Sequence, residues 1–386
     1  MESKSAVIVI PNDQARTGRK RPLFLHPVLG APLLTWLANA LTMQGVTRYF
    51  LVCQERYLSE AKQCLPEGCD IYACADREAG DPLHVFLSCA PASEHQVLVI
   101  TGTCVCLPPE KGEEPHAACA CQVPIAALVE ALDAPGFSFT GFLVSNGNAC
   151  TQLDGMYSIA DPGELAAIAG KLKLALLQSH ANRGVELWDM ESCYIDPGVT
   201  IGAGSVLRPG TVLRGRTSVG ADCILGPNAW LENAKVGSGC QINASQLLDC
   251  TVGNDCAIGP YSVLRSDSRL ETRVRVGSNT ELGNVLLGEG THVGASCCLK
   301  ELTCGRGCII GPGVCTAACL PENTGRTTIE DDAIIGAGTI FAGPGSVGRS
   351  AAVAPGSTIT QSVPTQALAT ARSRQITRKD WVIHQK

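Results

Sequence analysis

The sequence predicts two domains, an N-terminal α/β domain and a C-terminal parallel β-helix, within 386 residues. Two observations predict the β-helix: one apolar residue returns every six positions, and glycine often follows it directly. A third predicts the α/β domain, because apolar strand-like and helix-like segments alternate up to about residue 160. The apolar positions form three unbroken runs: Ile195, Ile201, Leu207, Leu213, Val219, Leu225 and Leu231; Val252, Ile258, Leu264, Leu270, Val276 and Leu282; and Ile329, Ile335, Phe341, Val347, Val353 and Ile359.

The α/β domain is predicted from its alternating elements in chain order. Strands are expected at Ala6–Ile10, Tyr49–Cys53 and Gln96–Ile100, with helices near Pro32–Met43 and Glu55–Cys64. Strands separated by helices predict a parallel sheet.

A long helix is predicted next, over Pro162–Ala181, because apolar residues recur there at helical spacing. The expected organisation is therefore an α/β domain over 1–160, a linking helix within 161–190, the β-helix over 191–363 and a basic tail over 364–386. Thr316–Arg326 (TAACLPENTGR) interrupts the repeats as an insertion, and loops that leave a rigid solenoid tend to carry function.

The repeats themselves are best explained as scaffold. Each unit is one short strand and a turn, and only a stack of coils buries a continuous apolar column. The glycine, asparagine and aspartate residues that follow are expected to suit turns with positive φ. Cys223, Cys240, Cys256 and Cys308 lie within the repeats, where a small apolar thiol packs well.

Composition excludes several classes of protein. The net charge of −6, with no basic block outside Arg16–Arg21, argues against a nucleic-acid partner. We expect no signal peptide, no membrane partner and a cytoplasmic location, in which most of the 21 cysteines are reduced. Cys104-Val-Cys106 and Cys119-Ala-Cys121 are weak hints of a metal site, and buried free thiols are the favoured interpretation.

The order of the parts resembles the bacterial bifunctional GlmU family over nearly the whole chain. The resemblance is strongest over Tyr194–Ile242, good again over Ile329–Trp381, and includes FLHPVLGAPLL at Phe24–Leu34. It implies an α/β nucleotidyltransferase-like (Rossmann-like) domain, shortened between Lys111 and Asp154, followed by a left-handed parallel β-helix of hexapeptide repeats that assembles as a homotrimer.

The same resemblance implies a function. The family makes UDP-N-acetylglucosamine, a peptidoglycan precursor, in two steps. Its β-helix acetylates glucosamine 1-phosphate with acetyl-CoA, and its α/β domain then couples the product to UTP with Mg²⁺. Sugar phosphates and CoA are thus the small-molecule partners that the resemblance implies.

The chain departs from the family where the nucleotide and metal should bind. The family's glycine-rich loop falls on Val9–Thr17, where Arg16 alone survives as a nucleotide-binding candidate, and its metal-binding aspartate falls on Thr103. We expect no magnesium site. Asp13, Asp81 and Asp161, together with Arg19, Lys20 and Arg21, are possible substitutes, although solvated surface charges are the favoured interpretation.

The acyltransferase residues match in part. The family's general base falls on Ala295, and His292, three residues earlier, is either a relocated base or a solvent-facing side chain; the second interpretation is favoured. The resemblance carries sugar-phosphate binding to Arg265, Tyr261 and Arg326, places a family tyrosine at Cys298, and carries acetyl-CoA binding to Ala337, Ala354 and Arg372.

Three functions are therefore considered. The first is a GlmU-like transferase of amino-sugar phosphate metabolism whose nucleotidyl transfer is inactive. The second is a non-catalytic trimeric paralogue that acts as a scaffold or ligand-binding regulator, favoured by the missing base and metal ligand. The third is a hexapeptide acyltransferase with a different acceptor.

Overall fold

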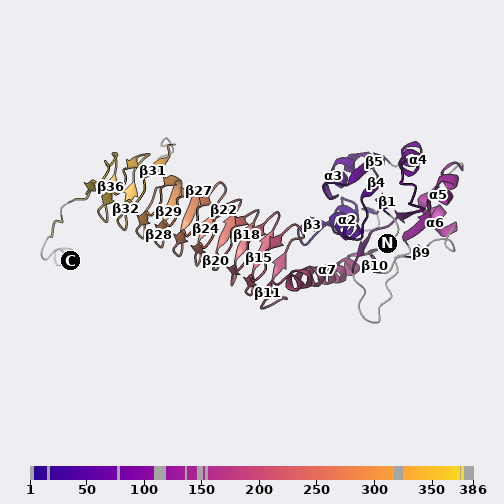
Figure 1. The fold of residues 1–386 in the computed structure, drawn as a ribbon, viewed down its shortest axis with the longest axis horizontal. Helices are drawn as coiled ribbons and strands as arrows, with labels where there is room; N and C mark the ends of the chain where they lie inside the picture. The colour runs from indigo at the N-terminus through magenta and orange to yellow at the C-terminus, as the bar shows by residue number, and fades with distance from the viewer. Residues whose placement is uncertain are drawn as a thin grey trace, which may run out of the picture. The chain divides into compact units, whose positions relative to one another are not determined.

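The chain divides into two compact units, Met1–Gln178 and Ser179–Lys386, in a computed structural model (Figure 1). The structure describes residues 4–14, 18–75, 79–107, 119–134, 137–145, 151–152, 155–316, 325–373 and 375–377. The fold class predicted from the sequence is confirmed: a nucleotidyltransferase-like α/β domain precedes a left-handed parallel β-helix of hexapeptide repeats. No helix within the described residues is both long enough and apolar enough to span a membrane.

A six-stranded sheet forms the middle of the first unit. Its spatial order is β5 (Asp70–Ala75), β4 (Arg48–Cys53), β1 (Ser5–Val9), β6 (Gln96–Ile100), β8 (Ala120–Pro124) and β9 (Thr151–Gln152). The first four strands are parallel, as predicted, but β8 pairs antiparallel with β6, and β9 antiparallel with β8. The prediction of a wholly parallel sheet is therefore wrong at this edge. A parallel partner needs a crossover, usually a helix, whereas β6 is followed by the short strand β7 (Cys104–Cys106), which pairs with β10 (Met156–Ser158).

Helices cover both faces of this sheet. One buried cluster joins it to α2 (Leu33–Met43), α3 (Leu58–Gln63) and the first half of α7 (Pro162–Asn182); a second joins it to α4 (Gly80–Ser88), α5 (Ile125–Leu132) and α6 (Phe139–Ser145). The helices predicted near Pro32 and Pro162 are confirmed, and the one predicted over Glu55–Cys64 consists of η2 (Glu55–Tyr57) followed by α3. The remaining short elements are η1 (Leu23–Leu25), β2 (Pro27–Val28) and β3 (Ala31–Pro32).

The β-helix has three faces, each a ladder of strands paired in parallel register. Face I consists of β11 (Glu186–Leu187), β14 (Val206–Leu207), β17 (Ile224–Leu225), β20 (Gln241–Ile242), β23 (Ala257–Ile258), β26 (Arg275–Val276), β28 (His292–Val293), β30 (Ile309–Ile310), β32 (Ile334–Ile335), β35 (Ala352–Val353) and β37 (Leu368–Ala369). Its first and last strands lie within the segments 161–190 and 364–386, to which the sequence assigned the linking helix and the tail.

The other two faces are formed in the same way. Face II consists of β12 (Tyr194–Ile195), β15 (Val212–Arg214), β18 (Trp230–Glu232), β21 (Gln246–Leu248), β24 (Val263–Leu264), the first halves of β27 (Glu281–Leu287) and β29 (Cys298–Cys304), β33 (Ile340–Phe341) and β36 (Thr358–Ile359). Face III consists of β13 (Thr200–Ile201), β16 (Ser218–Val219), β19 (Lys235–Val236), β22 (Thr251–Val252), β25 (Arg269–Leu270), the second halves of β27 and β29, β31 (Thr327–Ile329) and β34 (Ser346–Val347).

The six-residue repeat places one apolar side chain of each strand inside the coil. Leu207, Leu213, Leu264 and Leu282 are fully buried at such positions, as the repeat predicts. The glycine that follows has a different role at Gly202 from the one predicted. A Cβ there would lie 2.5 Å from the backbone N of Ala221 in the next coil, so glycine is required by close approach rather than by positive φ.

A second buried column lies two residues before each inward apolar side chain. Ser262 Oγ donates to the carbonyl of Gly277 in the next coil (2.7 Å), and Cys240 Sγ donates in the same way to Gly253 O (3.0 Å). Other side chains of this column donate the same kind of hydrogen bond to a backbone carbonyl of the next coil: the hydroxyls of Ser205, Thr280 and Thr291 and the thiols of Cys223, Cys256, Cys297 and Cys308. The repeat cysteines therefore donate hydrogen bonds between coils in addition to filling space.

Candidate functional site

The turn between faces I and II, here called corner I–II, holds one group of the predicted site residues. A backbone ladder runs along it: Tyr261 N donates to Ala244 O, Gly313 N to Ala295 O, and Gly356 N to Ala337 O (2.8–3.0 Å). Ala354 follows β35 on the same corner, and Arg372 Nη1 donates to Pro355 O (3.1 Å). Tyr261, Ala295, Ala337, Ala354 and Arg372 thus lie along a single edge of the β-helix.

Arg265 lies on the opposite edge of face II, here called corner II–III. Its Nε donates to Glu281 Oε1 in the next coil (2.8 Å), and Lys300 Nζ lies 3.7 Å from the same oxygen. The hydrogen bond from Arg265, and then the positive charge of Lys300, lower the pKa of the Glu281 carboxyl. Two cations therefore share one carboxylate on an exposed surface, and most donors of the Arg265 guanidinium remain available in this cluster.

Arg326 lies on the same corner but is held more tightly. Its Nε donates to Thr303 Oγ1 (2.6 Å), Nη1 to Asn284 Oδ1 (3.2 Å) and Nη2 to Leu302 O (3.0 Å). Three of its five N–H groups are therefore used within the protein. Arg326 anchors the end of the insertion, whose residues 317–324 lie outside the described part of the chain.

His292 lies on neither corner. It is an exposed residue on the outer surface of face I, in register between Arg275 and Ile309. It lines a shallow groove of about 420 Å³ together with Gln241, Asn243 and Arg275, among others. Ala295 lies beyond Gly294 on corner I–II, so the two positions predicted for a general base belong to different surfaces of one coil.

Cys298, at the position of the family tyrosine, lies on face II between Glu281 and Cys315. Burial, and then the neighbouring Cys315, raise the pKa of its thiol, so it is a poor source of thiolate. Sequence reasoning missed Glu281, Lys300 and Cys315 at this site. Their positions in the repeat could have identified them. Glu281 and Cys315 pair in register with Cys298, and Lys300 lies two residues after Cys298 on the same strand.

In the first unit, the described part of the loop after β1 is tied to the core through the carboxylate of Asp13. Asp13 is buried (5% exposed), and its carboxylate accepts hydrogen bonds from Leu23 N (3.1 Å) and from Thr103 Oγ1 (3.4 Å). Since donors already occupy this carboxylate and Thr103 carries no negative charge, the pair does not fit Mg²⁺. Where side chains are described, no group of three or more His, Cys, Asp or Glu residues is placed to hold a metal ion.

Three of the other charged candidates in this unit, Asp161, Arg19 and Arg21, have structural partners. Asp161 Oδ1 caps α7 by accepting hydrogen bonds from Gly163 N (2.7 Å) and Glu164 N (2.9 Å). Arg19 contacts both ring nitrogens of His26, and Arg21 pairs with Glu60 (2.9 Å). Asp81 lies in the first turn of α4, and Arg16 falls outside the described residues.

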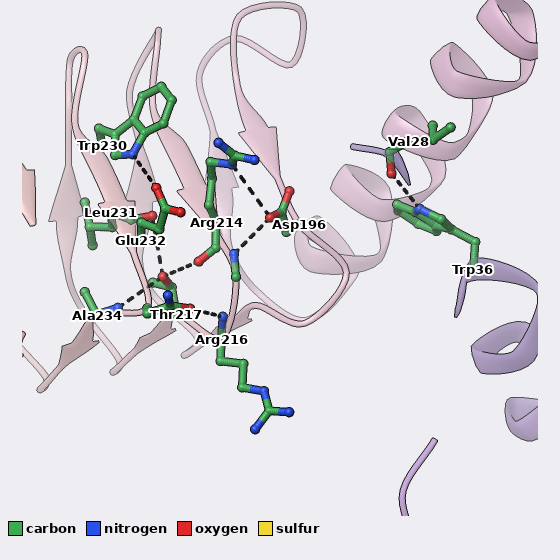
Figure 2. A network of polar contacts seen from close by, with 12 residues as sticks. Val28, Trp36, Asp196, Arg214, Arg216, Thr217, Trp230, Leu231, Glu232 and Ala234 are labelled. Atoms are coloured by element: carbon green, nitrogen blue, oxygen red, sulfur yellow. Dashed lines mark hydrogen bonds and ion pairs between the residues drawn. The ribbon is translucent and has the colours of Figure 1, made fainter. Parts of the chain in front are cut away.

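A polar network at the first coils was not predicted from the sequence (Figure 2). Asp196 Oδ2 accepts a hydrogen bond from Gly215 N (2.9 Å) and lies 3.9 Å from Arg214 Nε, while Thr217 Oγ1 donates to Arg214 O (2.6 Å). Burial raises the pKa of Asp196. These contacts join successive coils at corner II–III, so the network supports the scaffold on which Arg265 lies further along.

Comparison with known proteins finds partial matches. No family model matches the chain. "Bifunctional protein GlmU" of Brevibacillus brevis is 36% identical over 234 residues, which cover 58% of this chain and 51% of that protein; that of Carboxydothermus hydrogenoformans is 33% identical over 227 residues (59% and 51%). The chain thus spans about half the length of the curated relatives it matches.

Among solved structures, the UDP-N-acetylglucosamine acyltransferase of Francisella novicida is 16% identical with a TM-score of 0.29, and covers 47% of this chain and 65% of that one. The Arabidopsis UDP-N-acetylglucosamine acyltransferase is 16% identical with a TM-score of 0.30 (49% and 66%). Likeness of this extent does not bear on function.

Proposed function

We propose that the chain is a GlmU-like transferase of amino-sugar phosphate metabolism, in which the β-helix transfers an acetyl group from acetyl-CoA to the amine of a sugar phosphate. The observation that carries the proposal is the pair of cations, Arg265 and Lys300, that converge on one exposed carboxylate at corner II–III. The identity of 32–36% to GlmU proteins over about half of their length supports an amino-sugar phosphate as the substrate class.

The cation pair suits a phosphate group. An exposed ion pair contributes only about 0–1 kcal/mol, so a phosphate dianion can displace Glu281 from Arg265 at little cost. The guanidinium then donates two parallel hydrogen bonds to phosphate oxygens, and Lys300 adds a point charge. Arg326 completes the positive edge, with Tyr261 across face II on corner I–II.

Corner I–II fits the acyl donor. Its turns carry small residues at Ala295, Ala337 and Ala354, which leave room for an extended arm, and the charge of Arg372 is exposed beside them. Acetyl-CoA, when bound, supplies the activated thioester. Ala337, Ala354 and Arg372 hold it on this edge, and the attack on the thioester requires that a base accept the proton of the amine.

His292 is the histidine available for that proton, and Ala295 offers none. Loss of a general base lowers a rate by about 10²–10⁴-fold, so transfer by a chain with alanine at residue 295 is slow rather than absent. The proposal includes a homotrimer, in which a neighbouring subunit would bring a second face against each corner. Light scattering that showed a monomer at micromolar concentration would remove this part of the proposal.

The first unit retains the fold of a sugar-1-phosphate nucleotidyltransferase without its chemistry. Thr103 and the buried Asp13 stand where hard anionic ligands are needed, and Pro11 and Asn12 stand in the phosphate loop. We assign residues 1–160 to this domain, followed by the linking helix, and we extend the β-helix beyond the predicted 191–363 so that it includes β11 and β37, with the rest of 364–386 as the tail. Uridylyl transfer is not part of the proposed function.

Thiol release from acetyl-CoA in the presence of glucosamine 1-phosphate tests the proposal. Arg265→Ala should raise the KM for the sugar phosphate at least ten-fold. Arg273→Ala is a matched control, since Arg273 makes the same exposed contact with a glutamate of the next coil, Glu289, at another corner. An equal effect of the two substitutions would contradict the assignment of the phosphate to Arg265. His292→Ala should abolish transfer if His292 is the base and change nothing if it only faces solvent.

The second candidate is a non-catalytic trimeric scaffold or ligand-binding regulator. Ala295 and Thr103 favour it, because both positions lack the reactive group that the family carries. Calorimetric binding of CoA without turnover would support this function, and measurable turnover would exclude it. A different acceptor is favoured only by Cys298 in place of the family tyrosine, and a panel of amino sugars and amines tests it.

A further inference from the structure

Two of the four cysteines in the weak metal hint come together in the first unit. Cys104, at the start of β7, is fully buried, and Cys119, just before β8, is partly exposed. Their thiols lie close enough to shift each other's pKa, upward for Cys104 and downward for Cys119. Cys106 instead accepts a hydrogen bond from Gln44 Nε2 (3.1 Å), and Cys121 belongs to the core on the other side of the sheet. The cysteines therefore form a pair rather than a four-ligand site.

Several donors converge on the sulfur of Cys119. The thiol of Cys104, the backbone N–H of Cys119 itself, the hydroxyl of Ser158 and the backbone N–H of Gly102 lower its pKa, in that order. Ser158 lies opposite Cys104 in the β10–β7 pair, and Thr101 N holds the backbone of Cys119 through its carbonyl (2.8 Å). Donors aimed at a sulfur stabilise the thiolate, which is the reactive form of cysteine.

Gly102 is required for this arrangement. A Cβ at residue 102 would lie 2.8 Å from Cys119 Cβ and 3.1 Å from its Sγ, so any larger residue must push the sulfur away. The Cys104 thiol donates to Cys119, so the pKa of Cys104 is raised while that of Cys119 is lowered from 9.0 to about 7. Cys119 is thus the thiol that more readily forms the nucleophilic thiolate, and Cys104 lies next to it in the protonated form.

We propose that Cys104 and Cys119 form an oxidisable dithiol, in which Cys119 attacks a low-molecular-weight disulfide and Cys104 resolves the mixed disulfide. With oxidised glutathione, the Cys119 thiolate forms a mixed disulfide and releases one glutathione thiolate. That thiolate takes the proton of Cys104, whose sulfur attacks Cys119 and releases the second glutathione. Two protein thiols are oxidised to one disulfide, and one oxidised glutathione is reduced to two glutathiones.

The first test measures the reactivity of each thiol in the full-length reduced protein. At pH 7 a thiol with a pKa of about 7 has roughly fifty-fold more thiolate than a thiol with a pKa of 9.0. The thiolate of lower pKa is about eight-fold less nucleophilic, which offsets part of this gain. Cys119 should therefore react with iodoacetamide roughly six-fold faster at pH 7 than a thiol with a pKa of 9.0, and its rate plotted against pH should show an inflection near pH 7. The exposed Cys89 is the reference within the same chain. A Cys119 that reacts no faster than Cys89 would overturn the proposal.

The second test maps the product. After treatment with oxidised glutathione, non-reducing digestion and mass spectrometry should show a peptide in which Cys104 is joined to Cys119. Cys104→Ser keeps a hydroxyl donor, so Cys119 should still react but stop at the mixed disulfide. A wild-type protein that stops there too, or that shows neither product, would overturn the proposal even if a variant fails to fold.

Gly102→Ala tests the geometry directly, and Gly80→Ala is its control. A Cβ at Gly80 meets nothing within 4 Å, so this substitution should leave the reaction of Cys119 unchanged. Gly102→Ala should slow alkylation of Cys119 about five-fold or more at pH 7, since the sulfur loses its donors. Equal rates in the two variants would show that the donors around Cys119 do not set its reactivity.

Discussion

The buried hydroxyl and thiol column of the β-helix yields the sharpest stability prediction, and Ser262 is the position to change. Its side chain is fully buried, its Oγ donates to Gly277 O (2.7 Å), and it accepts a hydrogen bond from Thr280 N (3.3 Å). Ser262→Ala leaves a buried carbonyl and a buried N–H without this partner. Each such group costs about 1–3 kcal/mol, so we expect a loss of about 3 kcal/mol in the free energy of unfolding.

The cost should come from hydrogen bonding and not from shape. Alanine already stands on the same column at Ala229 and Ala234, both fully buried, so a methyl group fits the space. Cys256→Ser keeps a donor to the carbonyl of Glu271, which the thiol contacts at 3.1 Å, and should change stability by less than about 1 kcal/mol.

Guanidinium unfolding followed by far-UV circular dichroism measures both variants. Ser266→Ala is the control, because Ser266 lies on the same coil but is exposed and makes only a 3.5 Å contact with Asp249. We expect it to stay within about 0.5 kcal/mol of the wild type. If Ser262→Ala also stayed within that range, the column would be only a space-filling feature and the reasoning would be refuted.

Three further predictions concern the first unit. Glu94→Ala should lower the free energy of unfolding by about 3 kcal/mol, and Glu94→Gln should lower it less. The reason is that the buried Glu94 carboxylate accepts hydrogen bonds from Lys4 N, Ser5 N and Ser5 Oγ. An alanine variant as stable as the wild type in thermal or chemical unfolding would contradict this. Burial, and then the charge of Arg19, lower the pKa of His26 below 6.5. Below pH 6.5 the unfolded state therefore binds more protons than the folded state, so the free energy of unfolding should fall as the pH drops. His26→Gln should flatten this dependence of stability on pH. No Mg²⁺-dependent pyrophosphate should appear from UTP and N-acetylglucosamine 1-phosphate, since Thr103 and Asp13 bind each other; robust release would overturn this.

The β-helix could be predicted from the sequence because each face contributes one inward side chain per strand, which produces a fixed period. The period breaks where a turn at corner II–III is one residue shorter. Leu231 to Val236 and Leu282 to Leu287 are such five-residue steps, with Asn233 and Asn284 at positive φ in the turn. The α/β elements were predicted where apolar runs are long. β5 was missed because DIYACA is half exposed, without a continuous apolar signal.

The site could be predicted only as a set of residues and not as an arrangement. A motif fixes which positions to consider, but the coil decides that Arg265 and Arg326 lie on one corner and Tyr261 and Ala337 on another. The hydrogen bonds that occupy Arg326, and the Cys104–Cys119 pair, join segments far apart in the sequence. No local pattern encodes such contacts, because they depend on the register of strands that the sequence brings together only after folding.

The rate of CoA release from acetyl-CoA with glucosamine 1-phosphate tests the central claim most directly. We expect turnover that depends on the sugar phosphate, is about 10²–10⁴-fold below a rate supported by an intact general base, and is weakened by Arg265→Ala but not by Arg273→Ala. The complete absence of both turnover and CoA binding at millimolar ligand would contradict the claim that the β-helix is an acyltransferase.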